Sequence, residues 1–198
     1  MKKRYGGIYG MMMLLAALSV GCAEGRGENP AGIEKAAENR SVQDAAGTQE
    51  AESAGIVFTC PDVNGNSVSE TIFSQSKLTM VNVWATYCNP CLSEMPGLGE
   101  LAAAYDPEEF QIIGVISDVQ EGADEETIAA AAELIEATGA DYTHLLLSES
   151  VYFALLKDVT AVPTTFFIDE SGTVLDTVVG AMEKSSWEEK INALLEEQ

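Results

Sequence analysis

Residues 81–91 read VNVWATYCNPC, and this stretch decides the fold. Its first half belongs to the apolar run 78–85, which has the length of a strand covered on both faces of a sheet. The residues that follow, 89–104, predict a helix with Pro90 in the first turn, where proline is tolerated. Pro96 falls inside this segment and is expected to kink or break it. The two cysteines therefore stand where a buried strand passes into a helix.

The spacing of Cys88 and Cys91 lets two sulfurs bond across a single turn. Cys88 falls at the helix N-terminus, where backbone N–H groups and the helix dipole lower the pKa of a thiol. Cys91 lies one turn inside the helix, where it is shielded. This arrangement predicts redox chemistry, in which a Cys88 thiolate attacks a disulfide and Cys91 resolves the mixed disulfide.

Three other uses of the cysteine pair fit the sequence less well. A zinc site needs two more ligands, and Cys22, Cys60 and His144 offer no second pair. Covalent haem attachment needs a histidine after the second cysteine, where this chain has Leu92. A purely structural disulfide stays open, although a strand-to-helix junction favours redox chemistry.

The segment 56–198 alternates strand-like and helix-like patterns. Strands are expected at 56–58, 67–68, 110–117, 144–148, 164–169 and 173–179, and helices at 124–138, 150–157 and around 187–195. A turn at 170–172 joins the last two strands into an antiparallel hairpin. This order predicts an α/β domain whose sheet carries helices on both faces.

Two motifs carry a family resemblance. The stretch 81–91 followed by Glu94-Met95-Pro96, together with residues 162–169 (VPTTFFID), resembles the TlpA/ResA-like membrane-anchored thiol-disulfide oxidoreductases. The resemblance implies a thioredoxin fold, a central mixed sheet flanked by helices, with an N-terminal β extension. It also implies a cis peptide bond before Pro163, and catalysis with no cofactor beyond a redox-active Cys88–Cys91 disulfide.

The resemblance assigns roles to residues around the pair. Glu94 would accept the proton of Cys91, because Asn82 stands where cytoplasmic thioredoxins have a buried aspartate. The alternative for Glu94 is an exposed surface carboxylate. The family usually has tryptophan at the position of Tyr87, so the aromatic ring is kept and an indole N–H is lost. Residues expected to contact substrate are Trp84, Tyr87, Asn89, Pro90, Val162 and Pro163.

Three polar features fall outside these motifs. Cys60 is expected to be a small, partly buried side chain, and a second disulfide is the alternative. His144 is expected in a strand and not in the site. The acidic run from Asp118 to Glu126 is expected to be a solvated helix cap that could influence the choice of partner through charge.

The first 22 residues resemble a bacterial lipoprotein signal. A basic head precedes an apolar run too short to span a membrane, and Cys22 follows small residues. Residues 1–21 would be the signal peptide and Cys22 the lipidated residue; an ordinary cleaved signal with an incidental Cys22 is the alternative. Residues 22–55 hold no aromatic side chain, which predicts a disordered tether. The expected folded domain is 56–198.

Composition limits the classes of partner. Against 32 Asp and Glu residues the chain has 10 Lys and Arg, and its formal net charge of -22 argues against nucleic-acid binding. One histidine excludes multi-histidine metal sites, and no metal is expected.

Together these patterns predict an extracytoplasmic oxidoreductase that is lipid-anchored to the cell membrane and reduces disulfides of exported proteins. The resemblance implies apocytochrome c or other thiol enzymes as substrates, and a membrane thiol-electron donor. The alternatives are a thiol oxidase and a non-catalytic binding lipoprotein on the same scaffold. A peroxidase is disfavoured because residues 84–88 lack the proline of the usual peroxidatic motif.

Overall fold

A five-stranded mixed sheet forms the centre of the domain. The computed structural model describes residues 55–198, so the predicted signal peptide, Cys22 and tether lie outside the described residues. The strand order is β5-β4-β3-β6-β7, with β3, β4 and β5 parallel and β6 and β7 antiparallel to their neighbours. The strands span Leu78–Trp84 (β3), Phe110–Gln120 (β4), Thr143–Leu147 (β5), Thr164–Asp169 (β6) and Val174–Val179 (β7).

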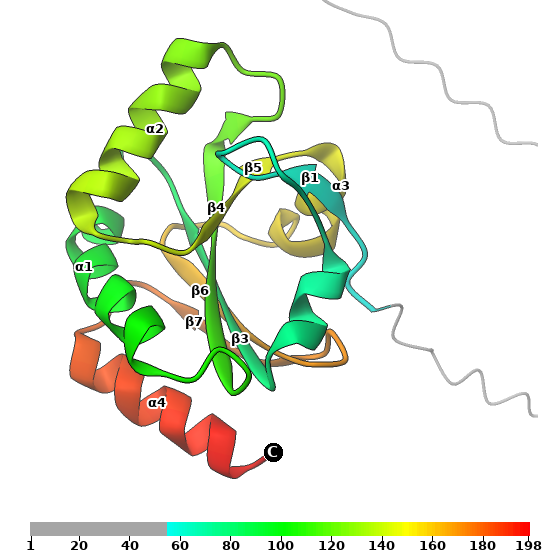
Figure 1. The fold of residues 1–198 in the computed structure, drawn as a ribbon, viewed down its shortest axis with the longest axis vertical. Coiled ribbons are helices and arrows are strands. Elements are labelled where there is room, and N and C mark those ends of the chain that lie inside the picture. The colour runs from blue at the N-terminus through cyan, green and yellow to red at the C-terminus, as the bar shows by residue number, and fades with distance from the viewer. Residues whose placement is uncertain (1–54) are drawn as a thin grey trace, which may run out of the picture. The chain divides into compact units, whose positions relative to one another are not determined.

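Three helices cover one face of this sheet (Figure 1). They are α1 (Asn89–Ala104), α2 (Glu125–Thr138) and α4 (Lys184–Glu196). Their apolar side chains pack with Trp84, Ile116 and Phe167, which the strands turn to this face. Side chains alternate along a strand, so the residues between these point to the opposite face.

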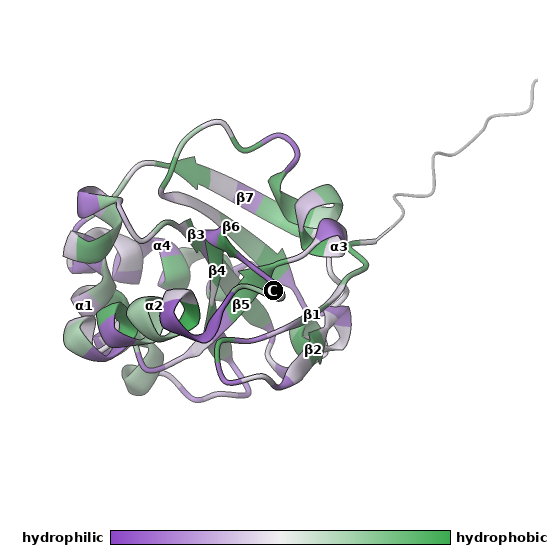
Figure 2. Ribbon diagram, turned by 90° about the horizontal axis from the view of Figure 1, so that it is seen from above, coloured by the Kyte–Doolittle hydropathy of each residue, from purple (hydrophilic) through white to green (hydrophobic). Residues whose placement is uncertain are grey.

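Shorter elements cover the other face. These are the hairpin β1–β2 (Thr59–Pro61 and Ser67–Ser69), the 3-10 helix η1 (Glu70–Gln75), α3 (Glu149–Val151) and the π-helical turn η2 (Tyr152–Leu156). Their apolar side chains meet Val81, Val83 and Ile113 in one cluster. Figure 2 shows the apolar strands between these two layers. The domain is therefore the predicted thioredoxin-like fold with an N-terminal β extension.

The helix that follows the cysteines has the bounds that its sequence predicts. Helix α1 continues from Asn89 to Ala104 with Pro96 inside it, so the proline does not break the helix. Helix α2 begins and ends as its sequence predicts. The side chain of Asp124 caps its first turn by accepting a bond from Thr127 N–H, and Gly139 ends it with a left-handed φ of 67°.

Two other predictions about elements need correction. The first strand is Thr59–Pro61, whereas residues 56–58 precede it without strand pairing. The predicted helix 150–157 is split into a three-residue α-helix and a π-helical turn. Such a turn changes which side chains face the same side, and Tyr152 and Leu156 of η2 contribute to the functional site below.

Candidate active site

Cys88 and Cys91 form a disulfide at the start of α1. The two sulfurs are 2.07 Å apart and the two Cα atoms are 5.3 Å apart. Cys88 is the N-cap residue, and its Sγ accepts a hydrogen bond of 3.2 Å from the backbone N–H of Cys91. Cys88 is 6% exposed and Cys91 is fully buried. Only the sulfur of Cys88 can therefore be reached from outside.

The chain before β6 lies beside the sulfur of Cys88. The Val162–Pro163 peptide bond is cis, and the carbonyl oxygen of Val162 lies 3.7 Å from Cys88 Sγ. Pro163 is buried, whereas Val162 is partly accessible. Asn89 and Pro90, which follow Cys88 in the chain, are exposed. Predicted site residues from both motifs, Asn89 and Pro90 from the first and Val162 and Pro163 from the second, thus lie close to Cys88.

Asp118 holds the loop that precedes Cys88. Its carboxylate accepts hydrogen bonds from the Thr86 N–H at 3.0 and 3.1 Å and from the Thr86 hydroxyl at 2.5 Å. The sequence analysis treated this residue only as part of an acidic run. Its position at the carboxyl end of β4, next to the end of β3, was the signal that could have linked it to the cysteines, because parallel strands end at the same edge of a sheet.

Glu94 is a buried carboxylate with three hydrogen-bond donors. Its Oε1 accepts a bond of 3.0 Å from Asn82 Nδ2, and its Oε2 accepts bonds from the Met182 N–H at 3.1 Å and from Trp187 Nε1 at 3.3 Å. The side chain is 7% exposed, which contradicts the alternative of a surface carboxylate. Burial raises the pKa of Glu94, and the three hydrogen bonds offset part of this rise.

The surroundings of Glu94 contain further polar groups. Asn82 Nδ2 also donates to Thr165 Oγ1, while Asn82 Oδ1 has no hydrogen-bond partner among the described residues. The buried hydroxyl of Tyr142 is likewise unpaired there, and burial followed by the charge of Glu94 raises its pKa. A cavity of about 410 Å³ lined by Pro90, Ser93, Glu94 and Lys184 opens to solvent beside the carboxylate. Glu94 can therefore exchange protons with solvent although it is buried.

Trp84 lies at the end of β3, within the predicted strand, and its side chain is turned into the core. It is completely buried, and its indole Nε1 donates a hydrogen bond of 3.2 Å to His144 Nδ1. A Cβ atom on Gly114 would lie 2.2 Å from that same His144 nitrogen, so only glycine leaves room for the ring. Trp84 is thus a core residue that supports the end of β3, and its predicted contact with substrate is wrong.

His144 lies in β5, as predicted, and makes two buried hydrogen bonds. Its Nε2 donates to the Ala140 carbonyl at 3.0 Å, which leaves Nδ1 to accept from Trp84. Burial lowers the pKa of His144 from 6.5 to about 4, partly opposed by the bond to Ala140. The folded protein therefore holds this imidazole neutral at a pH where an unfolded chain would protonate it.

This burial predicts a loss of stability in mild acid. Between pH 6.5 and about 4 the unfolded chain gains a proton that folded His144 does not accept. The free energy of unfolding should therefore fall by roughly 3 kcal/mol over this window as the pH is lowered. In His144→Gln, whose amide can replace both hydrogen bonds, the unfolding free energy measured in urea should depend less on pH between 6.5 and about 4. The same pH dependence in both proteins would show that His144 does not cause the loss of stability.

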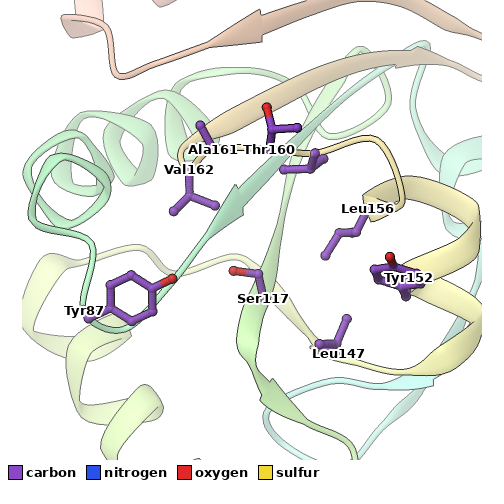
Figure 3. Close-up of a pocket in the computed structure, with 9 residues that line it drawn as sticks. Tyr87, Ser117, Leu147, Tyr152, Leu156, Thr160, Ala161 and Val162 are labelled. Carbon is purple, nitrogen blue, oxygen red and sulfur yellow. The ribbon is translucent and has the colours of Figure 1, made fainter. Parts of the chain in front are cut away.

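An apolar groove lies beside Cys88, because it is lined by the preceding residue Tyr87 and by Val162, whose carbonyl approaches the Cys88 sulfur. It has a volume of about 280 Å³, and Figure 3 shows Tyr87 and Val162 on one side, Leu147, Leu156 and Tyr152 on the other, and Ser117 between them. Tyr87 is 74% exposed, so its ring stands free beside Cys88. The groove brings η2 to the site, a contribution that the sequence analysis missed.

Cys60 has a buried environment that does not favour thiol chemistry. It is 2% exposed in β1 and carries a free thiol. Burial and the charges of Glu121 and Asp62 raise its pKa to about 12. The side chain is therefore a small apolar core residue, as predicted. Residues 55–198 contain no group of three or more His, Cys, Asp or Glu side chains placed to hold a metal ion.

Comparisons with known proteins agree with this geometry. The AhpC/TSA family model matches residues 52–177, which is more than half of the chain. The chain belongs to the AhpC/TSA family. Within the family it is similar to thioredoxin-like protein YneN of Bacillus subtilis, with 29% identity over 60% of this chain and 66% of that protein. It is also similar to thiol:disulfide interchange protein DsbE of Pseudomonas fluorescens, with 29% identity over 69% of this chain and 70% of that protein.

A solved structure has a similar fold to this AhpC/TSA family member. MTB dsbF is 26% identical, with a TM-score of 0.58 over 70% of this chain and 96% of that one. The fold, the Cys88–Cys91 disulfide and these relatives together define a thioredoxin-like thiol-disulfide oxidoreductase of the ResA/DsbE type.

Proposed function

We propose that this protein reduces disulfides of exported proteins while tethered to the outer face of the cell membrane. The observation that carries the proposal is the asymmetry of the disulfide. One sulfur is accessible beside the Val162 carbonyl and an apolar groove, and the other is completely buried. A purely structural disulfide needs neither a groove nor an accessible sulfur. The alternative of a binding lipoprotein leaves the accessible sulfur without a use.

The reaction follows from this asymmetry. In the reduced protein, the Cys88 thiolate attacks one sulfur of a substrate disulfide, and the other substrate sulfur leaves as a thiolate and takes up a proton. Cys91 then loses its proton and attacks Cys88 Sγ. This step releases the second substrate thiol and restores the Cys88–Cys91 disulfide, so two electrons pass to the substrate. The helix N-terminus at Cys88 stabilises the thiolate form.

Glu94 accepts the proton of Cys91 in this scheme. It lies three residues further along α1, so both side chains share one side of the helix. Its raised pKa makes Glu94 a stronger base than an exposed glutamate, and the cavity beside it connects the carboxylate to solvent. Asn82, Trp187 and the Met182 N–H hold the carboxylate in one orientation.

The location rests on the N-terminal sequence. Its basic head, short apolar run and Cys22 resemble a lipoprotein signal, and lipidated Cys22 would hold the domain at the membrane through a tether. Among the described residues no helix is long and apolar enough to cross a membrane. Exported disulfide-containing proteins, such as apocytochrome c or other thiol enzymes, are the proposed substrates. A membrane thiol donor would return Cys88 and Cys91 to the reduced state.

The redox potential tests the direction of electron flow. A reductase should show a midpoint near that of thioredoxin, about -270 mV, in equilibrium with a dithiol buffer. A midpoint near that of DsbA, about -120 mV, would instead support the oxidase alternative. Cys60→Ala should titrate with the same midpoint, because that buried thiol takes no part in the couple. Failure of the reduced protein to reduce insulin would favour the non-catalytic alternative.

A further inference from the structure

The apolar groove continues away from the disulfide into an acidic hollow. The hollow has a volume of about 540 Å³, and Leu147 and Tyr152 line both it and the groove. Glu121 and Glu149 line the hollow beyond these two side chains. A molecule that extends from Cys88 along the groove therefore passes over apolar side chains first and then meets two carboxylates.

These two carboxylates pair with no cation among residues 55–198. Both are exposed, and neither side chain makes a hydrogen bond or ion pair with another described residue. The carboxylate of Asp118, by contrast, accepts hydrogen bonds from Thr86. The charges of Glu121 and Glu149 are thus available to a partner at the end of the groove.

The lysine side chains of the domain lie next to other carboxylates. Residues 55–198 contain four lysines, no arginine and 25 Asp or Glu residues. Each lysine lies within ion-pair distance of a carboxylate, and none lines the groove or the hollow. The pairs are Lys77–Glu109, Lys157–Asp158, Lys184–Glu100 and Lys190–Asp176. The surface around the groove therefore attracts positive charge and repels negative charge.

We infer that the groove and hollow bind an extended basic polypeptide segment that carries the disulfide to be reduced. Its cysteine lies at Cys88, and an apolar side chain fills the groove between Tyr87 and Tyr152 (Figure 3). A nearby Lys or Arg faces Glu121 and Glu149. The inference deepens the proposed function, because it names the class of substrate segment that the same site selects. Apolar contacts supply affinity, and the charges supply selection and speed of encounter.

Binding of cysteine-free peptides tests the inference apart from redox chemistry. Two synthetic peptides share one leucine and have serine in place of cysteine, and they differ only in flanking lysines or flanking glutamates. Calorimetry with the oxidised protein at low salt should show at least about tenfold tighter binding of the lysine peptide. Glu121→Gln/Glu149→Gln should weaken that binding by roughly fivefold, since exposed charge pairs contribute modestly.

A matched double variant distinguishes the effect of the two charges at the hollow from the effect of the overall charge of the protein. Glu196→Gln/Glu197→Gln removes the same charge from the C-terminal end of α4, which Figure 1 shows at the opposite edge from the turn between β4 and α2. It should bind the lysine peptide as the unaltered protein does. Equal weakening by both double variants, or no preference between the peptides, would overturn the inference. Insulin reduction by the same proteins reports on the proposed function independently, so either conclusion can fail alone.

Discussion

Replacing Cys88 by serine should lower the rate of disulfide reduction by at least about 10³-fold, because a hydroxyl supplies no thiolate at neutral pH. Cys88 is the only sulfur of the pair that a substrate can reach, and its position at the N-cap of α1 is what stabilises the charged form. Buried Cys91 cannot take over the attack. The measurement is the initial rate of insulin reduction by the fully reduced protein.

Two further variants make this test specific. Cys60→Ala also removes one thiol but should keep the full rate, since Cys60 is buried in β1. Cys91→Ala should attack substrate and then stop, and the mixed disulfide with Cys88 should accumulate on a non-reducing gel. If Cys88→Ser keeps its activity, or if Cys91→Ala accumulates no adduct, then the order of attack and resolution is wrong.

Replacing Glu94 by glutamine should slow resolution of the mixed disulfide by about 10²-fold at neutral pH, the scale of a lost proton acceptor. In the unaltered protein the resolution rate should rise with pH as Glu94 ionises through its raised pKa. In Glu94→Gln this rise should be absent. Stopped-flow measurement of substrate-thiol release across the pH range reports both effects.

Stability separates this chemical role from a structural one. Because the pKa of Glu94 is raised in the folded state, ionisation destabilises the fold as the pH rises through that value. Glu94→Gln removes this dependence, so its unfolding free energy should become less sensitive to pH in the same window. Glu100→Gln removes an exposed carboxylate from the same helix and should leave the resolution rate unchanged. A slowed rate with an unaltered pH profile would show that Glu94 is not the acceptor.

The elements that surround the cysteines could be predicted from local sequence patterns. A buried strand, a helix with proline in its first turn and the VPTTFFID strand are each specified by neighbouring residues, and β3, α1 and β6 lie where these patterns place them. The same holds for α2, whose capping residues are encoded at both ends. The break expected at Pro96 follows from a local rule, whereas α1 continues through the proline and packs against α2, α4 and β4.

The remaining parts of the site depend on contacts between distant segments. Trp84 lies three residues before exposed Tyr87, and only the tertiary structure, with its bond to His144 in β5, shows that it turns into the core. Burial of Glu94 depends on Trp187, 93 positions away. Periodicity also could not show that η2 adopts a π-helical turn whose Tyr152 and Leu156 line the groove. Such features follow from the tertiary structure and not from a local pattern.

The placement of Cys91 within one turn of Cys88 also sets how long a partner stays attached. A group held in position beside its target can act as though its concentration were on the order of 10⁵ M, far above any dissolved thiol. Cys91, buried and 5.3 Å from Cys88 between Cα atoms, is such a group. Cys91 therefore resolves the mixed disulfide before any dissolved thiol can, and the lifetime of the covalent complex is the same in thiol-rich and thiol-poor surroundings.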